Sequence, residues 1–182
     1  MATTALLTIE DFERLPSEQT KNHELVEGEL VDVSGNTMDH NDLRDLLVEI
    51  LRPIVREQRL GKVLSEQEYD FGGNAHGPDV SFFTPVKRPL ANWNSRVQRF
   101  VPDLAIEIVS QNDTWSGLMR KKERYLACGT REVWIIDQES AEILIYSDRG
   151  NRILKGDDTI ETELIPGFSI TVAELFHRLE QV

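Results

Sequence analysis

The chain has 182 residues, of which 40% are hydrophobic and 29% are charged, a composition typical of globular proteins. Its 20 basic and 32 acidic side chains give a formal net charge of −12, which argues against a general nucleic-acid-binding surface. The single cysteine, Cys128, excludes an internal disulfide framework and a cysteine-rich zinc site.

Nothing in the sequence predicts a membrane segment or a division into domains. No apolar run approaches the ~18 residues that a transmembrane helix needs. Residues 1–7 have neither a basic region nor a long apolar stretch, so a signal peptide is not expected, and we predict a cytoplasmic protein. Because no repeat or linker interrupts the pattern, residues 1–182 are expected to form one domain.

The first third of the chain predicts a short helix, a β-hairpin and a long helix. Residues 8–11 form a capping-box pattern that begins a helix before Pro16. Residues 23–33 hold two apolar stretches around Glu27-Gly28, which favours a hairpin. Asp39 is the expected cap of a long helix that ends before Gly61. Its apolar stripe, interrupted by Pro53, consists of Leu43, Leu46, Leu47, Ile50, Leu51, Ile54 and Val55.

The middle of the chain predicts strands separated by a loop. Residues 62–71 and 80–83 look like strands, and residues 85–99 are polar enough to suggest an exposed, irregular loop. Residues 104–109 predict a buried strand. A helix is expected from Trp115 to Cys128, with Gly129 at its C-terminal end.

The last third predicts a second hairpin and a C-terminal helix. Residues 132–137 and 142–147 form the hairpin, and short strands are expected around Ile153 and Ile160. Residues 171–174 form another capping-box pattern, which begins the last helix. This order of elements predicts an α/β fold with a central mixed sheet flanked by helices.

Glu107 is the most informative polar residue because its strand is otherwise apolar. Alternation places Leu104, Ile106 and Ile108 on one face of that strand and Glu107 on the other. A buried carboxylate is costly unless it is paired or bound to a cation, which makes Glu107 a candidate site residue. The alternative is an ordinary ion pair with an arginine, or a solvated sheet face.

The helix after this strand carries a candidate lysine. Helical spacing groups four side chains on one face: Leu118, Lys121, Lys122 and Tyr125. It places three charged neighbours elsewhere on the wheel: Arg120, Glu123 and Arg124. Lys121 therefore stands among apolar neighbours and is either a functional cation or a side chain that reaches out to solvent.

Two further polar residues follow or begin predicted elements. Asp79 follows Pro78 at the start of a strand, a position that also suits a simple turn aspartate. His40 lies at the start of the long helix and is read as a residue of its cap region. No HExxH, CxxC or Walker A pattern is present, so those chemistries are not predicted.

A series of segments, taken in order, resembles a known family. They are residues 23–30 (HELVEGEL), a helix beginning near His40, residues 78–82 (PDVSF), residues 102–110 (PDLAIEIVS), Asp113-Thr114, Lys121, Tyr125 and residues 129–137 (GTREVWIID). This series is similar to the Uma2 family (DUF820), which is abundant in cyanobacteria and belongs to the PD-(D/E)XK restriction-endonuclease-like superfamily. The resemblance covers residues 8–168, nearly the whole chain.

The resemblance implies a restriction-endonuclease-like fold with a nuclease site that uses Mg²⁺ or Mn²⁺. Asp79 matches the aspartate of the PD motif and Glu107 the acidic residue of the second half-motif. These two carboxylates and the Ile108 carbonyl would be the metal ligands. Glu24 matches a glutamate that the superfamily often places beside the metal, where it would hold a second metal or a metal-bound water.

The lysine departs from the superfamily pattern. Its usual position falls at Val109, which cannot serve, so the resemblance moves the role to Lys121, with Lys122 as the alternative. The catalytic set implied by the resemblance is therefore Asp79, Glu107, Lys121 and Glu24.

Three functions are compatible with these patterns. The first is a metal-dependent endonuclease that cuts DNA, expected to act as a homodimer because two copies reach both strands. The second is a non-catalytic binding or regulatory module that keeps the fold, which the negative net charge favours. The third is a structural partner of another protein, which predicts an exposed apolar patch around Trp93 or Trp115. A basic rim beside Glu107 would support the nuclease.

Overall fold

The computed structural model describes residues 6–33 and 35–180, so most of the segment considered for a signal peptide lies outside the described residues. The largest sheet has six strands in the order β11-β10-β9-β8-β6-β3. Their bounds are β3 Lys62–Ser65, β6 Val80–Phe83, β8 Leu104–Ile108, β9 Glu132–Asp137, β10 Glu142–Ser147 and β11 Gly150–Lys155. Because β8 and β9 are parallel while the other neighbours are antiparallel, the predicted mixed sheet is confirmed.

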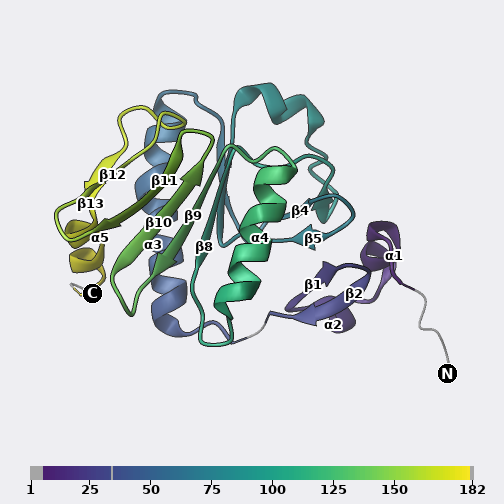
Figure 1. Ribbon diagram of the computed structural model, residues 1–182. Coiled ribbons are helices and arrows are strands. Elements are labelled where there is room, and N and C mark those ends of the chain that lie inside the picture. The colour runs from purple at the N-terminus through teal and green to yellow at the C-terminus, as the bar shows by residue number, and fades with distance from the viewer. Residues whose placement is uncertain (1–5, 34, 181–182) are drawn as a thin grey trace.

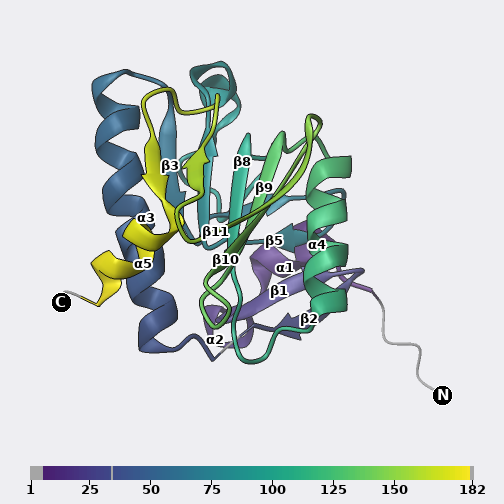
Figure 2. The same cartoon turned by 60° about the vertical axis from the view of Figure 1, so that its left-hand side comes forward.

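Helices cover both faces of this sheet. Figure 1 shows α4 (Trp115–Ala127) in front of the strands and α3 (Met38–Glu57) behind them, and in Figure 2 the strands lie between these two helices. The alternation predicted for β8 holds. Leu104 and Ile106 pack in the core under α3, whereas Ala105 packs with Tyr125 of α4. The face of β8 that carries Ala105 is therefore also the face that presents Glu107 toward α4.

A second sheet carries the N-terminal hairpin and has the strand order β2-β1-β5-β4-β7. Its strands are β1 His23–Val26, β2 Glu29–Asp32, β4 Glu68–Asp70, β5 Ala75–His76 and β7 Val97–Gln98, preceded in the chain by α1 Ile9–Arg14 and α2 Ser17–Thr20. The expected hairpin is confirmed. Its turn residues Glu27 and Gly28 have φ values of 53° and 82°, as a two-residue hairpin turn requires.

The apolar pattern of residues 62–71 predicted one strand, but the structure divides this segment into β3 and β4. Glu66 adopts φ 52°, and this left-handed residue ends β3 and redirects the chain into β4 of the other sheet. One continuous stretch of sequence thus links the two sheets. The expectation of a single strand was wrong because the side-chain pattern alone does not reveal where the backbone bends.

Two other local expectations were also corrected. The loop expected at 85–99 contains a 3₁₀ helix, η1 Pro85–Leu90, and the buried strand β7. The long helix is capped by Thr37, whose side chain accepts the His40 N–H, and not by Asp39. The helix continues through Pro53 to Glu57, as the predicted stripe and the position of Gly61 indicated.

The C-terminal part follows the predicted order. Strands β12 (Thr159–Glu161) and β13 (Ser169–Thr171) form a small antiparallel pair. Thr171 caps α5 (Val172–Leu179) by accepting the Glu174 N–H. At the other end of the chain, Thr8 and Asp11 form the predicted capping box of α1. Within the described part of the chain, no helix combines the length and the apolar character needed to span a membrane.

Candidate active site

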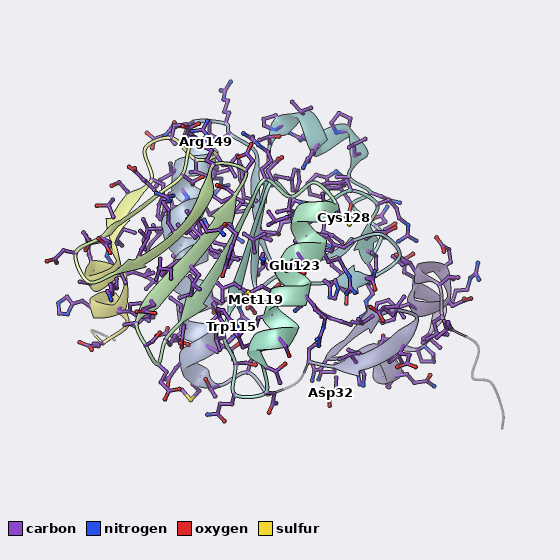
Figure 3. All side chains as sticks on the ribbon, in the orientation of Figure 1. Asp32, Trp115, Met119, Glu123, Cys128 and Arg149 are labelled. Carbon is purple, nitrogen blue, oxygen red and sulfur yellow. The ribbon has the colours of Figure 1, made fainter. Side chains whose placement is uncertain are left out.

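A pocket of about 760 Å³ lies where the two sheets meet. Its walls are the β1–β2 hairpin, the start of α3, the loop after β8 and one face of α4. Figure 3 places Asp32, which lines this pocket, at the end of β2 that faces the lower part of α4. All four candidate side chains line it: Glu24, Asp79, Glu107 and Lys121.

Asp79 and Glu107 face the pocket from neighbouring strands. The antiparallel register of β6 and β8 pairs Val80 with Ile106, which sets Asp79 opposite Glu107 on the same face of the sheet. The Ile108 N–H donates to Asp79 Oδ2 at 2.7 Å, so the aspartate is fixed beside the backbone of the glutamate's own strand.

Lys121 lies between two carboxylates. Its Nζ is 3.2 Å from Glu24 Oε1 and 3.2 Å from Glu107 Oε2. Lys122 points elsewhere, with its Nζ 3.7 Å from Glu123 Oε1 and 4.7 Å from the centre of the Tyr146 ring. Of the two lysines that the sequence left open, the structure therefore brings Lys121 into the pocket.

Both oxygens of Glu24 already accept hydrogen bonds. Oε1 accepts from the Gly77 N–H at 3.1 Å and is ion-paired with Lys121, and Oε2 lies 2.8 Å from His76 Nδ1. Burial alone would raise the pKa of Glu24, but Lys121, His76 and the Gly77 amide together lower it to about 2. Glu24 is thus a firmly charged anion whose contacts are directed at Lys121, not at an open cation site.

Glu107 has the opposite electrostatic character. Its Oε1 accepts the Tyr125 hydroxyl at 2.7 Å. Burial raises its pKa, Lys121 opposes this, and the neighbouring Asp79 and Glu24 raise the pKa further, to about 8. Burial alone would lower the pKa of Lys121, but Glu107, Glu24 and Asp79 together raise it. The site therefore holds a charged lysine beside a glutamate that readily takes up a proton.

His40 is a pocket residue that the sequence analysis read only as part of a helix cap. It is almost completely buried, and its Nε2 lies 3.4 Å from Asp79 Oδ1. Burial lowers the pKa of His40, but Asp79 and the Ile108 carbonyl outweigh this and raise it. A sequence signal existed, because the spacing of His40, Leu43 and Leu47 places them on one helical stripe. In the structure all three side chains are buried.

Arg124 and His76 were also missed. Arg124 was placed elsewhere on the helical wheel, yet it lines the pocket and its Nη1 lies 2.9 Å from His76 Nε2. His76 belongs to the two-residue strand β5, which is too short to show any periodicity. No sequence signal could have assigned this histidine to the pocket.

The pocket wall is strongly acidic, contrary to the basic rim that would support a nuclease directly. Eight carboxylates line it: Glu24, Glu27, Asp32, Glu66, Glu68, Asp79, Glu107 and Asp113. Three lysines and arginines line it: Arg120, Lys121 and Arg124. Such a wall attracts cations, and a bound cation is needed before a phosphate group can approach it closely.

The donor set fits a hydrated divalent cation. In the described ranges 6–33 and 35–180, no group of three or more His, Cys, Asp or Glu side chains is arranged to hold a metal. Two facing carboxylates suffice for Mg²⁺, which usually keeps several waters and binds through one or two carboxylates. The buried His40 Nδ1 has no hydrogen-bond partner among the described residues, so the neighbourhood of Asp79 retains an unsatisfied polar atom.

Comparisons with known proteins identify the family and the fold. The sequence model of the Uma2 family, described as "Putative restriction endonuclease", matches residues 9–173. A solved structure of a "putative nuclease belonging to DUF820" from Anabaena variabilis superimposes with a TM-score of 0.84 at 21% identity, covering 95% of this chain and 99% of the other. A search of curated proteins found no match. The predicted restriction-endonuclease-like α/β fold is confirmed.

The opposite pKa shifts of Glu24 and Glu107 predict opposite effects of two isosteric substitutions on stability. The folded-state pKa of Glu107 is raised from 4.5 to about 8, so the stability that this group contributes falls as the pH rises through that window. Without metal, Glu107→Gln should become more stable relative to wild type between pH 5 and 8, by on the order of 2 kcal/mol. Urea unfolding followed by circular dichroism in EDTA measures this difference.

Glu24→Gln is the matched control. The folded-state pKa of Glu24 is lowered from 4.5 to about 2, so its stabilisation is present above pH 4.5 and is lost as the pH falls toward 2. This variant should therefore be less stable than wild type throughout the range from pH 5 to 8. Equal losses of stability for both variants at pH 8 would contradict the assigned charge states.

Proposed function

Because the chain belongs to the Uma2 family, we propose that it is a metal-dependent nuclease that hydrolyses phosphodiester bonds in DNA. The observation that carries this proposal is the placement of the Lys121 ammonium 3.2 Å from Glu107, on the face of the sheet where Asp79 stands opposite that glutamate. Two facing carboxylates with an adjacent lysine are the parts that phosphodiester hydrolysis requires.

Asp79, Glu107 and the Ile108 carbonyl are the groups that would hold Mg²⁺ or Mn²⁺. When bound, such a cation supplies Lewis-acid activation of the phosphoryl group and lowers the pKa of an attacking water. Asp79 is suited to hold it because the Ile108 N–H and His40 already fix its carboxylate. Glu107 must give up its proton to take part, since its pKa lies near 8.

Lys121 would stabilise the phosphoryl group through its charge. Its raised pKa keeps the ammonium protonated at neutral pH, so it donates hydrogen bonds and cannot act as a base. Negative charge that develops on a phosphoryl oxygen beside Glu107 would be met by this ammonium. Glu24 would keep the ammonium in place. We propose this role for Glu24 instead of the binding of a second metal or a metal-bound water that the resemblance implied.

A non-catalytic module is the second candidate, and the acidic pocket favours it. Eight carboxylates against three lysines and arginines oppose the approach of a DNA backbone in the absence of cations. The two candidates differ in one requirement: only a nuclease has to bind a cation tightly enough to offset this repulsion. We place the activity in the cytoplasm, where a nuclease of this family would meet DNA.

The catalytic assignment predicts a graded loss of cleavage. Glu107→Gln should reduce Mg²⁺-dependent cleavage to background, because Gln is nearly isosteric but loses the charge that holds the cation. Lys121→Met should lower the rate by about 10²–10³, as expected when one preorganised donor is lost. Single-stranded, double-stranded and branched DNA should each be assayed with Mg²⁺ and with Mn²⁺.

Lys122→Met is the matched control for the lysine. Lys122 is adjacent in sequence but pairs with Glu123, so its removal should leave the cleavage rate within about twofold of wild type. Equal losses for both lysine variants would show that the assignment of Lys121 is wrong.

Cation binding can be tested without cleavage. Millimolar Mg²⁺ should raise the melting temperature of the wild-type protein, because a ligand that binds only the folded state stabilises it by mass action. The shift should be much smaller in Glu107→Gln and in Asp79→Asn. A wild-type protein that shows neither a Mg²⁺-dependent shift nor cleavage would instead support the non-catalytic module.

We also propose a homodimer, in which two sites reach the two strands of a duplex. Trp93 and Trp115 are 59% and 57% exposed, so large apolar side chains are available on the surface for an interface. Light scattering over a range of concentrations should give about twice the chain mass of 20.8 kDa. A mass of one chain at every concentration would exclude the dimer.

A further inference from the structure

A chain of polar contacts runs from the tip of the N-terminal hairpin to the candidate lysine. Arg124 Nη2 lies 3.1 Å from Glu27 Oε1, and Arg124 Nη1 lies 2.9 Å from His76 Nε2. His76 Nδ1 lies 2.8 Å from Glu24 Oε2. Glu24 Oε1 in turn lies 3.2 Å from Lys121 Nζ. The inner members, His76 and Glu24, are almost fully buried.

The partners of His76 define its protonation. A guanidinium group can only donate hydrogen bonds, so the Nε2 atom that faces Arg124 must be the acceptor. The proton of the neutral ring then resides on Nδ1, which donates to Glu24. Burial lowers the pKa of His76 and Glu24 raises it, but the positive charges of Lys121 and Arg124 add to the effect of burial, so the pKa is lowered overall, which agrees with a neutral ring.

His76 also contacts the second carboxylate of the site through an aromatic neighbour. The His76 and Tyr125 rings meet edge to face with centroids 5.7 Å apart, and Tyr125 stacks on Phe71 at 4.1 Å. The Tyr125 hydroxyl donates to Glu107. One imidazole therefore touches both the glutamate that holds Lys121 and the tyrosine that holds Glu107.

We propose that His76, oriented by Arg124, is a positioning residue that fixes Glu24 and, through Glu24, the Lys121 ammonium. The positioning of Lys121 does not depend on the proposed function. Only the role of the ammonium toward a phosphoryl group rests on it. Lys121 reaches the pocket from a helix on a long, flexible side chain, so confining it costs rotamer entropy that rigid partners must offset. Glu24 can be such a partner only if its own carboxylate is held, and His76 and the Gly77 N–H hold it.

The chemical accessibility of Lys121 tests this proposal without any cleavage assay. Reductive methylation of the whole folded protein, read by mass spectrometry with fragmentation, gives separate rates for Lys121 and Lys122. The two lysines are neighbours with similarly low side-chain exposure, 18% and 14%, which makes Lys122 an internal standard. Only Lys121 is connected to the His76 chain.

Two variants break the chain at different points. His76→Leu removes the donor to Glu24, and the milder Arg124→Gln removes the group that fixes the ring. Each should raise the Lys121 labelling rate roughly tenfold, the effect of losing one hydrogen bond to a charged group, and leave Lys122 unchanged. His76→Gln, whose amide can again donate to Glu24, should restore much of the slow rate.

Arg120→Gln is the control, since it removes the same charge from the same helix and should leave Lys121 unchanged. Unchanged Lys121 rates in both His76→Leu and Arg124→Gln would overturn the proposal, as would equal acceleration of both lysines, which indicates general loosening. Mg²⁺-dependent melting shifts of the same variants report on the proposed function separately. A wild-type protein without a Mg²⁺ shift, but with Lys121 selectively released in the variants, would retain the positioning role and reject the nuclease.

Discussion

The site depends on a buried ammonium that two carboxylates share. Removing a lysine and two glutamates from water costs several kcal/mol for each ion, and only close opposite charges with further hydrogen bonds offset that cost. Glu24 comes from the hairpin, Glu107 from the central sheet and Lys121 from α4. Their mutual contacts therefore require three elements, which are distant in the sequence, to meet at one point. The cluster therefore lies where the two sheets meet.

The two carboxylates around Lys121 differ in how strongly they hold a proton. Glu24 is held by an amide, a histidine and the lysine, so it remains charged and its orientation is fixed. Glu107 receives the tyrosine hydroxyl and the lysine, yet it faces a second anion, Asp79, across the strands. Repulsion and burial favour a proton there when no metal is bound. Under the proposed function, a divalent cation that replaced the proton would relieve both penalties, so metal binding would be coupled to proton release.

Much of the fold could be predicted from the sequence, because in long amphipathic or apolar segments the periodicity of the apolar residues identifies the element and the face that it buries. The α3 stripe, the buried β8 strand and the β9–β10 hairpin are of this kind. The failures involve backbone geometry and very short elements. Glu66 redirects the chain at a positive φ, and β5 is only two residues long.

The same distinction explains what was predicted of the site. Glu107 and Lys121 were found because each is a charged residue within an apolar pattern, and Asp79 and Glu24 because the resemblance supplied their positions. His76 and Arg124 act through contacts between elements far apart in the sequence, which no local pattern encodes. His40 lay on a recognisable apolar stripe, but its position near the start of the helix suggested a cap.

The acidic pocket opposes the binding of DNA that the proposed function requires. A protein with a formal net charge of −12 gains little from long-range attraction to a polyanion, so the affinity has to arise within the pocket. There, two of the three basic side chains, Lys121 and Arg124, are ion-paired with Glu24, Glu107 and Glu27, which reduces the positive charge that they offer to a phosphate group. Under the proposed function, bound cations would supply much of the charge that attracts a phosphate group, and substrate binding itself would then depend on metal. In such a site the metal is a condition for binding as well as for chemistry, and weak cation affinity alone would convert the nuclease fold into a non-catalytic module.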